Sequence, residues 1–182
     1  LVAQSLLVWL TLAYESSRLQ EEAENVATDA ATEVRRELLL AMQNLQAGDE
    51  WGIDARRHPG LLRLELRDAE RRLVRAWDSP METPLFQYLP RASLETDVEV
   101  ACALARRTAS PAFSRSYYVP LASGRGIEVI DLCVPWRAEG REAGVRVATV
   151  GLGLLLEGPA AARGARRYEL ACVEGEGSRL AR

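Results

Sequence analysis

The chain has 182 residues, of which 48% are apolar and 27% are charged, the balance of a globular protein and not of a disordered one. Its 23 basic and 26 acidic side chains give a net charge of −3, which argues against a nucleic-acid binder, because neutralising phosphates needs a basic surplus. One histidine and three cysteines argue against a four-ligand zinc site.

The first segment, residues 1–14, carries no charge. Fourteen helical residues span about 21 Å, which is less than the roughly 30 Å hydrocarbon core of a bilayer. Trp9 and Tyr14 suit the membrane interface. We therefore interpret the segment as the trailing part of a membrane helix that anchors the chain. A buried helix or a signal-peptide remnant would also fit.

A helical pattern continues directly from this segment. Its apolar residues are spaced by three or four positions and form one stripe: Leu19, Ala23, Val26, Ala30, Val34, Leu38, Ala41 and Leu45. No proline or glycine occurs before Gly48, so the pattern predicts a helix of about 45 residues. The stripe can cover the sheet of its own domain, or form the seam of a homodimer and act as a signalling stalk.

An alternating pattern replaces the helical one after Gly48. In residues 62–67, leucines alternate with Arg, Glu and Arg, which predicts a half-buried strand with the charged side chains facing solvent. Residues 68–71 form an acidic turn, and residues 73–77 form the returning strand.

Pro80, Pro84 and Pro90 then indicate a loop, and a helix is predicted to follow with Ser93 as its N-cap. Residues 116–121, 127–135 and 145–150 read as strands, followed by a short helix over 152–156. This order predicts an α+β fold, with a mainly antiparallel sheet of about five strands covered by the long N-terminal helix.

This order of elements resembles the extracytoplasmic PAS-like Cache (PDC) sensor domains of two-component sensor histidine kinases. The resemblance rests on residues 64–68 with Leu73 and Val74 for the first hairpin, on 117–120 and 128–135 for the central strands, and on 144–150 for the last strand. It implies small-ligand sensing in the periplasm and signalling through the membrane to a kinase. The chain itself carries no kinase core, so it corresponds at most to the sensing part.

We divide the chain into four segments. These are a truncated membrane helix over 1–14, a helical stalk over 15–47, the Cache/PAS-like sensor domain over 48–157, and a linker with the start of a second module over 158–182. The assignment of a second module rests on a weak similarity between the sequence patterns of residues 62–76 and 168–182.

The resemblance places a ligand pocket between the central sheet and residues 80–111. The polar and aromatic residues available there are Tyr88, Arg91, Arg115, Tyr117, Tyr118 and Asp131. Asp131 lies in an apolar strand, where a carboxylate needs a partner such as an internal arginine or a ligand amine. Tyr117 and Tyr118 point to opposite faces, so one of them reaches a given pocket. Arginine with tyrosine favours an organic acid, and adding Asp131 favours an amino acid or an amine.

Cys102 and Cys133 lie on the predicted helix and a central strand, so their side chains meet if these two elements pack together. They form a disulfide in an oxidising periplasm, or remain two small buried thiols.

An enzyme is not expected from this segment. Gly151 and Gly153 imitate part of a dinucleotide-binding fingerprint, but its third small residue is missing. The single histidine, His58, lies in a Pro-Gly loop and has no partner nucleophile. We therefore expect no catalytic residue, metal or cofactor. A membrane-anchored periplasmic interaction domain, or the sensor region of a chemoreceptor or of a cyclic-dinucleotide enzyme, remains an alternative to the kinase sensor.

Overall fold

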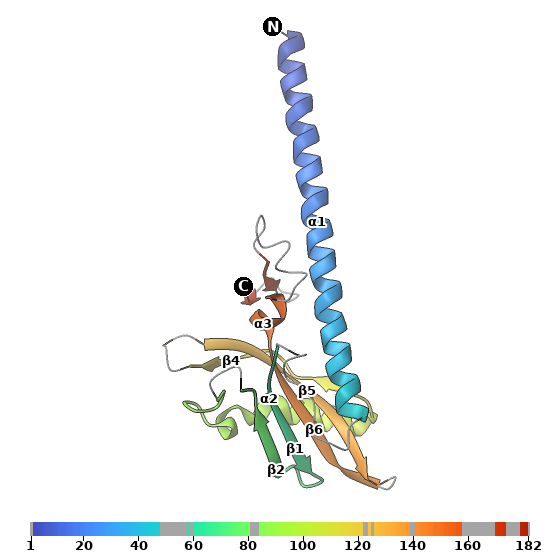
Figure 1. The fold of residues 1–182 in the computed structure, drawn as a ribbon, viewed down its shortest axis with the longest axis vertical. Helices are drawn as coiled ribbons and strands as arrows, with labels where there is room; N and C mark the ends of the chain where they lie inside the picture. The colour runs from blue at the N-terminus through green and yellow to red at the C-terminus, as the bar shows by residue number, and fades with distance from the viewer. Residues whose placement is uncertain are drawn as a thin grey trace.

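The computed structural model describes residues 2–47, 58, 60–80, 84–121, 124, 126–138, 141–157, 170–173 and 179–181. A long helix, α1 (Val2–Ala47), leads into a sheet with one helix, α2 (Glu95–Thr108), packed on it (Figure 1). The strands and the remaining helix, in chain order, are β1 (Leu61–Asp68), β2 (Leu73–Asp78), β3 (Ala112–Phe113), β4 (Tyr117–Pro120), β5 (Gly126–Ala138), β6 (Arg141–Gly151), α3 (Leu152–Leu156), β7 (Cys172–Val173) and β8 (Arg179–Ala181).

The main sheet has six strands in the order β2-β1-β6-β5-β3, with β4 also pairing with β5. All of its pairings are antiparallel. The α+β class with a mainly antiparallel sheet, predicted from the sequence, is confirmed, with six strands because the strand beside β5 is broken into β3 and β4. The break occurs at Ser114, whose backbone N–H donates to the Asp131 carbonyl and whose hydroxyl accepts from the Asp131 N–H.

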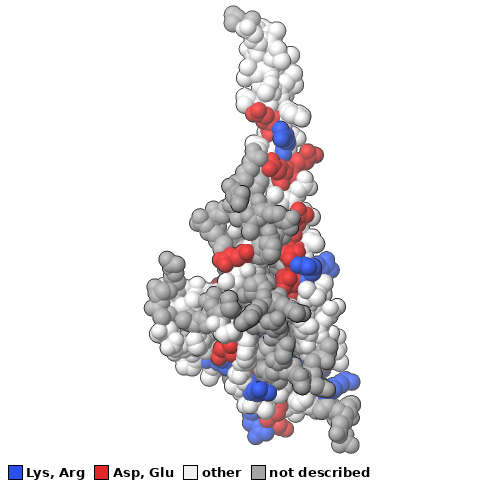
Figure 2. Space-filling view, in the orientation of Figure 1, with Lys and Arg blue, Asp and Glu red and all other residues white. Residues whose placement is uncertain are grey.

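The helix α1 has 46 residues and is therefore about 69 Å long. Its N-terminal half stands clear of the sheet (Figure 1), and Leu7, Trp9 and Tyr14 are each more than 60% exposed. Residues 2–14 contain no charged side chain, and Figure 2 shows acidic and basic side chains further along the helix. Within the described ranges, no helix has an apolar stretch long enough to cross a membrane.

The C-terminal half of α1 covers one face of the sheet. Leu45 packs in a buried cluster with Leu61, Leu64 and Leu132. The Arg146 Nη1 atom donates to the Leu45 carbonyl at 2.6 Å, which satisfies one of the unpaired carbonyls that every helix leaves at its C-terminus. The helix is therefore attached to the sheet through both apolar packing and a hydrogen bond.

The opposite face of the sheet is covered by α2, so the long helix is not the only layer over the sheet. Val98 and Ala105 are fully buried in a cluster with Val145 and Val147. The prediction that Ser93 caps this helix is wrong. A 3₁₀ turn, Arg91–Leu94, leads into α2, so the N-cap position falls on Leu94, which makes no side-chain cap.

The charged side of β1 is also buried, contrary to the expectation that it faces solvent. Glu65 is 1% exposed and Arg67 is 4% exposed, and Arg63 is half-buried. The sheet is covered on both faces. Leu64 therefore packs in the apolar cluster beneath α1, whereas Glu65 and Arg67 are buried on the opposite face. The ionic side forms the candidate site.

Candidate functional site

The candidate site is centred on Asp131, which lies in the middle of β5 and is fully buried. Its Oδ1 atom accepts a hydrogen bond from the Thr149 hydroxyl at 2.6 Å, and its Oδ2 atom accepts one from the Tyr117 hydroxyl at 2.8 Å. The strand register explains this convergence. Asp131 pairs with Thr149 across β5 and β6, and Tyr117 pairs with Val129, two residues before Asp131 on the same face.

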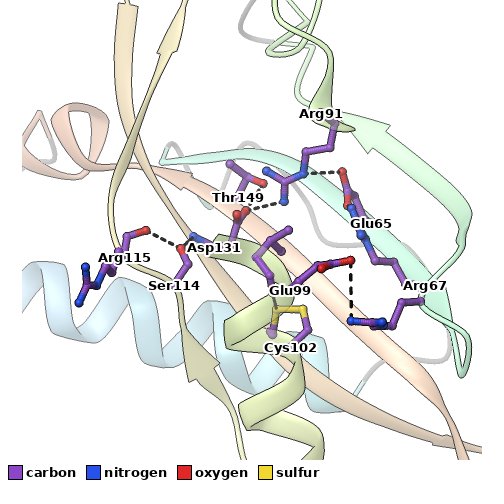
Figure 3. Close-up of a disulfide and its surroundings, with 12 residues drawn as sticks. Glu65, Arg67, Arg91, Glu99, Cys102, Ser114, Arg115, Asp131 and Thr149 are labelled. Atoms are coloured by element: carbon purple, nitrogen blue, oxygen red, sulfur yellow. Dashed lines mark hydrogen bonds and ion pairs between the residues drawn. A yellow bond between two sulfur atoms is a disulfide. The ribbon is translucent and has the colours of Figure 1, made fainter. Parts of the chain in front are cut away.

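Arg91 enters the site from the 3₁₀ turn that precedes α2. Its Nη2 atom lies 2.9 Å from Asp131 Oδ1, and its Nε atom lies 3.4 Å from Glu65 Oε1. Its Nη1 atom donates to the Tyr117 hydroxyl. Nε and Nη2 form these ion pairs without the alignment of a hydrogen bond. Figure 3 shows the guanidinium of Arg91 between the two carboxylates, so Arg91 bridges Glu65 and Asp131.

Glu65 has two further arginine partners on its own strand. Its Oε1 atom accepts from Arg63 Nε at 2.8 Å, and its Oε2 atom accepts from Arg67 Nε at 2.9 Å and from Arg67 Nη2 at 2.8 Å. Arg63 also donates to both carboxylate oxygens of Asp78, at 2.8 and 2.9 Å. Each of the three guanidinium groups, those of Arg63, Arg67 and Arg91, is therefore paired with at least one carboxylate.

The electrostatics follow from burial and from these pairs. Burial raises the pKa of Glu65, but the charges of Arg91 and Arg67 and the arginine hydrogen bonds outweigh it, so the pKa is lowered below its ordinary value. Burial, together with the neighbouring Asp131 carboxylate, raises the pKa of Tyr117 far above its ordinary value. Burial alone would lower the pKa of Arg91, but Asp131 and the other acidic neighbours raise it. At neutral pH, Glu65 and Arg91 are therefore charged, and Tyr117 is a neutral hydrogen-bond donor.

Two aromatic rings lie against the arginines. The Cζ atom of Arg91 is 4.7 Å from the centroid of Phe86 and 5.9 Å from that of Tyr117. The Cζ atom of Arg63 is 5.4 Å from the same Phe86 centroid. Contacts at these distances are cation–π interactions, which are strongest when the cation is removed from water. We refer to Glu65, Phe86, Arg91, Tyr117, Asp131 and Thr149 as the Arg91 cluster.

Three of the six predicted ligand residues belong to the Arg91 cluster, namely Arg91, Tyr117 and Asp131. The other three do not. Tyr118 and Tyr88 are 53% and 54% exposed, and Arg115 is exposed and directed away from the cluster (Figure 3). Tyr118 is excluded by the strand parity that brings Tyr117 inward. A ligand-binding role for the three that converge stays a prediction.

Sequence reasoning missed Glu65, Phe86 and Thr149. Glu65 was assigned to the solvent face because charged residues in an alternating strand are usually exposed. Arg63 and Arg67 lie two residues before and two residues after Glu65, on the same face of the strand. They could have indicated burial, because a buried carboxylate needs positively charged partners. Thr149 and Phe86 gave no comparable signal, because their importance depends on pairing and loop position.

A disulfide lies beside the cluster. Cys102 of α2 and Cys133 of β5 are joined with an S–S distance of 2.00 Å, which is one of the two arrangements that the sequence left open, and Cys172 is free. Cys133 follows Asp131 by two residues on the same strand face, and α2 begins directly after the turn that carries Arg91 (Figure 3). The covalent bond therefore fixes the helix after Arg91 to the strand that carries Asp131.

No family model matches the sequence, and no curated protein is significantly similar to it. Among solved structures, one described as "Methyl-accepting Chemotaxis protein X" is similar to this chain with a TM-score of 0.39 and 13% sequence identity. The similarity covers 81% of this chain and 65% of that chain, so less than two thirds of the other protein is represented. At this level the similarity assigns no function, and the function has to be inferred from the Arg91 cluster.

Proposed function

We propose that this chain is the extracytoplasmic sensing region of a membrane-bound signal-transduction receptor, and that it binds a small polar organic ligand at the Arg91 cluster. The observation that carries the proposal is the buried ionic group of Glu65, Arg91 and Asp131 on the sheet face beneath residues 84–94. Such a group is a poor source of stability, because replacing a buried ion pair by apolar side chains is often neutral or stabilising. A binding role gives a reason for retaining these charges inside the domain.

The proposed location is the bacterial inner membrane, with the domain facing the periplasm. The uncharged and exposed N-terminal segment of α1 supports an anchor in the bilayer. The disulfide between Cys102 and Cys133 supports an oxidising compartment, because disulfides are rare in reducing ones.

The proposed mechanism is a shift between two arrangements of the segment around Arg91. A ligand that pairs with Arg91 or Asp131 differently in the two arrangements changes their populations, and only such a difference can do so. On the other face of β5, Leu132 packs with Leu45 of α1, so a movement of β5 is passed to the helix. If two chains form a homodimer by packing the apolar stripes of their α1 helices together, the movement of β5 produces a small shift or rotation of the paired helices.

The output is proposed to be a histidine kinase of the two-component type. A chemoreceptor or a cyclic-dinucleotide enzyme would use the same sensing domain with a different output.

An interaction domain without a small ligand is the alternative function. An apolar groove of about 500 Å³ beside α1 favours it, with Val34, Leu38 and Met42 on one side and Phe113 and Leu156 on the other. A protein partner seated in this groove would leave the Arg91 cluster with a structural role.

Thermal unfolding of the full chain, with its disulfide intact and in mild detergent, tests the sensing function. Organic acids, amino acids and organic amines are added separately to the wild type, to Asp131→Asn and to Arg115→Gln, which alters an exposed arginine and serves as the control. A ligand at about 100 times its Kd stabilises the folded state by about 2.7 kcal/mol, which corresponds to about 5–11 °C for a chain of this size.

We expect one chemical class to raise the Tm of the wild type and of Arg115→Gln, and to lose this effect in Asp131→Asn. Calorimetric titration well below the Tm of Asp131→Asn separates lost binding from lost stability. If no compound shifts the wild type, or if Asp131→Asn binds as tightly as the wild type, sensing at the Arg91 cluster is refuted.

A further inference from the structure

The surroundings of Arg91 have the composition of a binding site for an organic cation. Two carboxylates lie at 2.9 and 3.4 Å from its guanidinium nitrogens, and the rings of Phe86 and Tyr117 lie at 4.7 and 5.9 Å from its Cζ atom. Carboxylates and aromatic faces are the groups that bind ammonium and guanidinium ions in proteins. In this structure the position is filled by a side chain of the protein itself.

Arg91 is a poorly fitted occupant. Its side chain is 9% exposed, yet Nε and Nη2 lack hydrogen bonds of good geometry. By contrast, Arg63 and Arg67 make aligned hydrogen bonds to Glu65 at 2.8 and 2.9 Å. Ion pairs without aligned hydrogen bonds are weaker than the aligned pairs that Glu65 forms with Arg63 and Arg67, so another cation can compete for the position of Arg91.

Charge balance limits the class of competitor. Glu65 keeps Arg63 and Arg67 when Arg91 leaves, whereas among the described residues Arg91 is the cation paired with Asp131. An anion that drew Arg91 away would leave the Asp131 carboxylate buried without a positive charge, which is very costly. A cation that displaces Arg91 keeps this carboxylate paired.

The backbone position of Arg91 allows such a displacement. Arg91 lies on the 3₁₀ turn between the loop of residues 84–90 and α2, whereas its two carboxylate partners lie in the interior of the sheet. Phe86 lies on the same loop. The turn can therefore withdraw the guanidinium of Arg91 without breaking strand pairing.

We propose that Arg91 is a tethered occupant of an organic-cation site, and that the sensed ligand has an ammonium or guanidinium head that displaces it from Asp131 and Glu65. The inference rests on the proposed sensing function and names the ligand class of the same site. Arg91 then holds the ligand-free arrangement, and its release is the first event of signalling.

Chemical rescue of Arg91→Ala tests the proposal. The variant removes the tethered guanidinium and leaves space of the same shape between the carboxylates and the rings. Methylguanidinium chloride at about 10 mM, compared with sodium chloride at equal ionic strength, should raise the Tm of Arg91→Ala by several degrees. It should bind this variant at least about tenfold more tightly than the wild type, in which the site is already occupied.

Three comparisons make the test specific. Arg115→Ala removes an exposed guanidinium and should show no rescue. Adding Asp131→Asn to Arg91→Ala should abolish rescue, and sodium acetate should have no effect on Arg91→Ala. If Arg91→Ala does not fold, Arg91→Lys keeps a shorter tethered cation and should bind methylguanidinium more tightly than the wild type does.

Equal binding by the wild type and the Arg91 variants, rescue of Arg115→Ala, or rescue by acetate would overturn the inference. Failure of the inference is distinguishable from failure of the sensing function. An anionic ligand that stabilises the wild type, together with absent rescue by methylguanidinium, refutes the cation site and leaves sensing intact. Absence of binding by every compound refutes both.

Discussion

Replacing Asp131 by asparagine removes one charge from the buried ion pair while nearly preserving the shape of the side chain. Arg91 would then remain buried beside Glu65, which already accepts hydrogen bonds from Arg63 and Arg67. Removing one partner of a buried ion pair costs about 3–5 kcal/mol, because the other charge is left uncompensated. For a chain of 182 residues this corresponds to a Tm lower by about 6–20 °C.

A double-mutant cycle with Arg91→Met isolates the pair. The double variant has neither charge, so its loss of stability should be smaller than the sum of the two single losses by about 2–3 kcal/mol. The free energy of unfolding is measured by urea titration at pH 7 without reductant, so that the disulfide between Cys102 and Cys133 stays intact. Tyr118→Phe, which alters a half-exposed tyrosine outside the Arg91 cluster, is the control and should change stability by less than about 0.5 kcal/mol.

Two results would refute the reasoning. Additivity of the two single losses within about 0.5 kcal/mol would mean that Arg91 and Asp131 are not energetically coupled. A loss below about 1 kcal/mol in Asp131→Asn would mean that the carboxylate is not held in a dry ionic cluster.

Glu65→Gln should be less stable than the wild type at pH 7, and the difference should shrink at about pH 3.5. The pKa of Glu65 is lowered in the folded state, so its contribution is complete above the unfolded value of about 4.3 and disappears as the pH falls through the folded value. Urea unfolding at both pH values measures this, and an unchanged difference would contradict it. Replacing Cys102 and Cys133 together by alanine should cost about 2–4 kcal/mol, because the bond closes a loop with a sequence separation of 31. Cys172→Ser should change stability by less than about 0.5 kcal/mol. Thiol titration of the denatured, unreduced wild type should detect one free thiol, that of Cys172, and a count of three free thiols would contradict the disulfide.

The helix and strand types could be predicted from local patterns because apolar residues recur every three or four positions on a helix and every two on a strand. The apolar stripe without proline or glycine required a long helix, and α1 ends at Ala47, one residue before Gly48. The alternating segments required strands, and hairpin turns made them antiparallel. The break between β3 and β4 at Ser114 was not predictable, because it depends on hydrogen bonds to Asp131 on the neighbouring strand.

The site was predictable only in part. Strand parity correctly separated Tyr117 from Tyr118, since side chains on one strand alternate between faces. The apolar neighbours of Asp131 correctly indicated a buried carboxylate that needs a partner. Sequence reasoning assigned Glu65 to solvent because it treated the sheet as covered on one face.

What the sequence by itself determined are the properties that depend on near neighbours, such as the length of α1, the strand directions, and which side chains share a face. What only the tertiary structure decided is which distant charges meet. Arg91 comes from a turn, Glu65 from β1 and Asp131 from β5, and their pairing depends on α2 and the preceding loop closing over the second face of the sheet. A charged side chain has the same local pattern in water and in a buried ion pair, because the difference is made by the layer that removes the water.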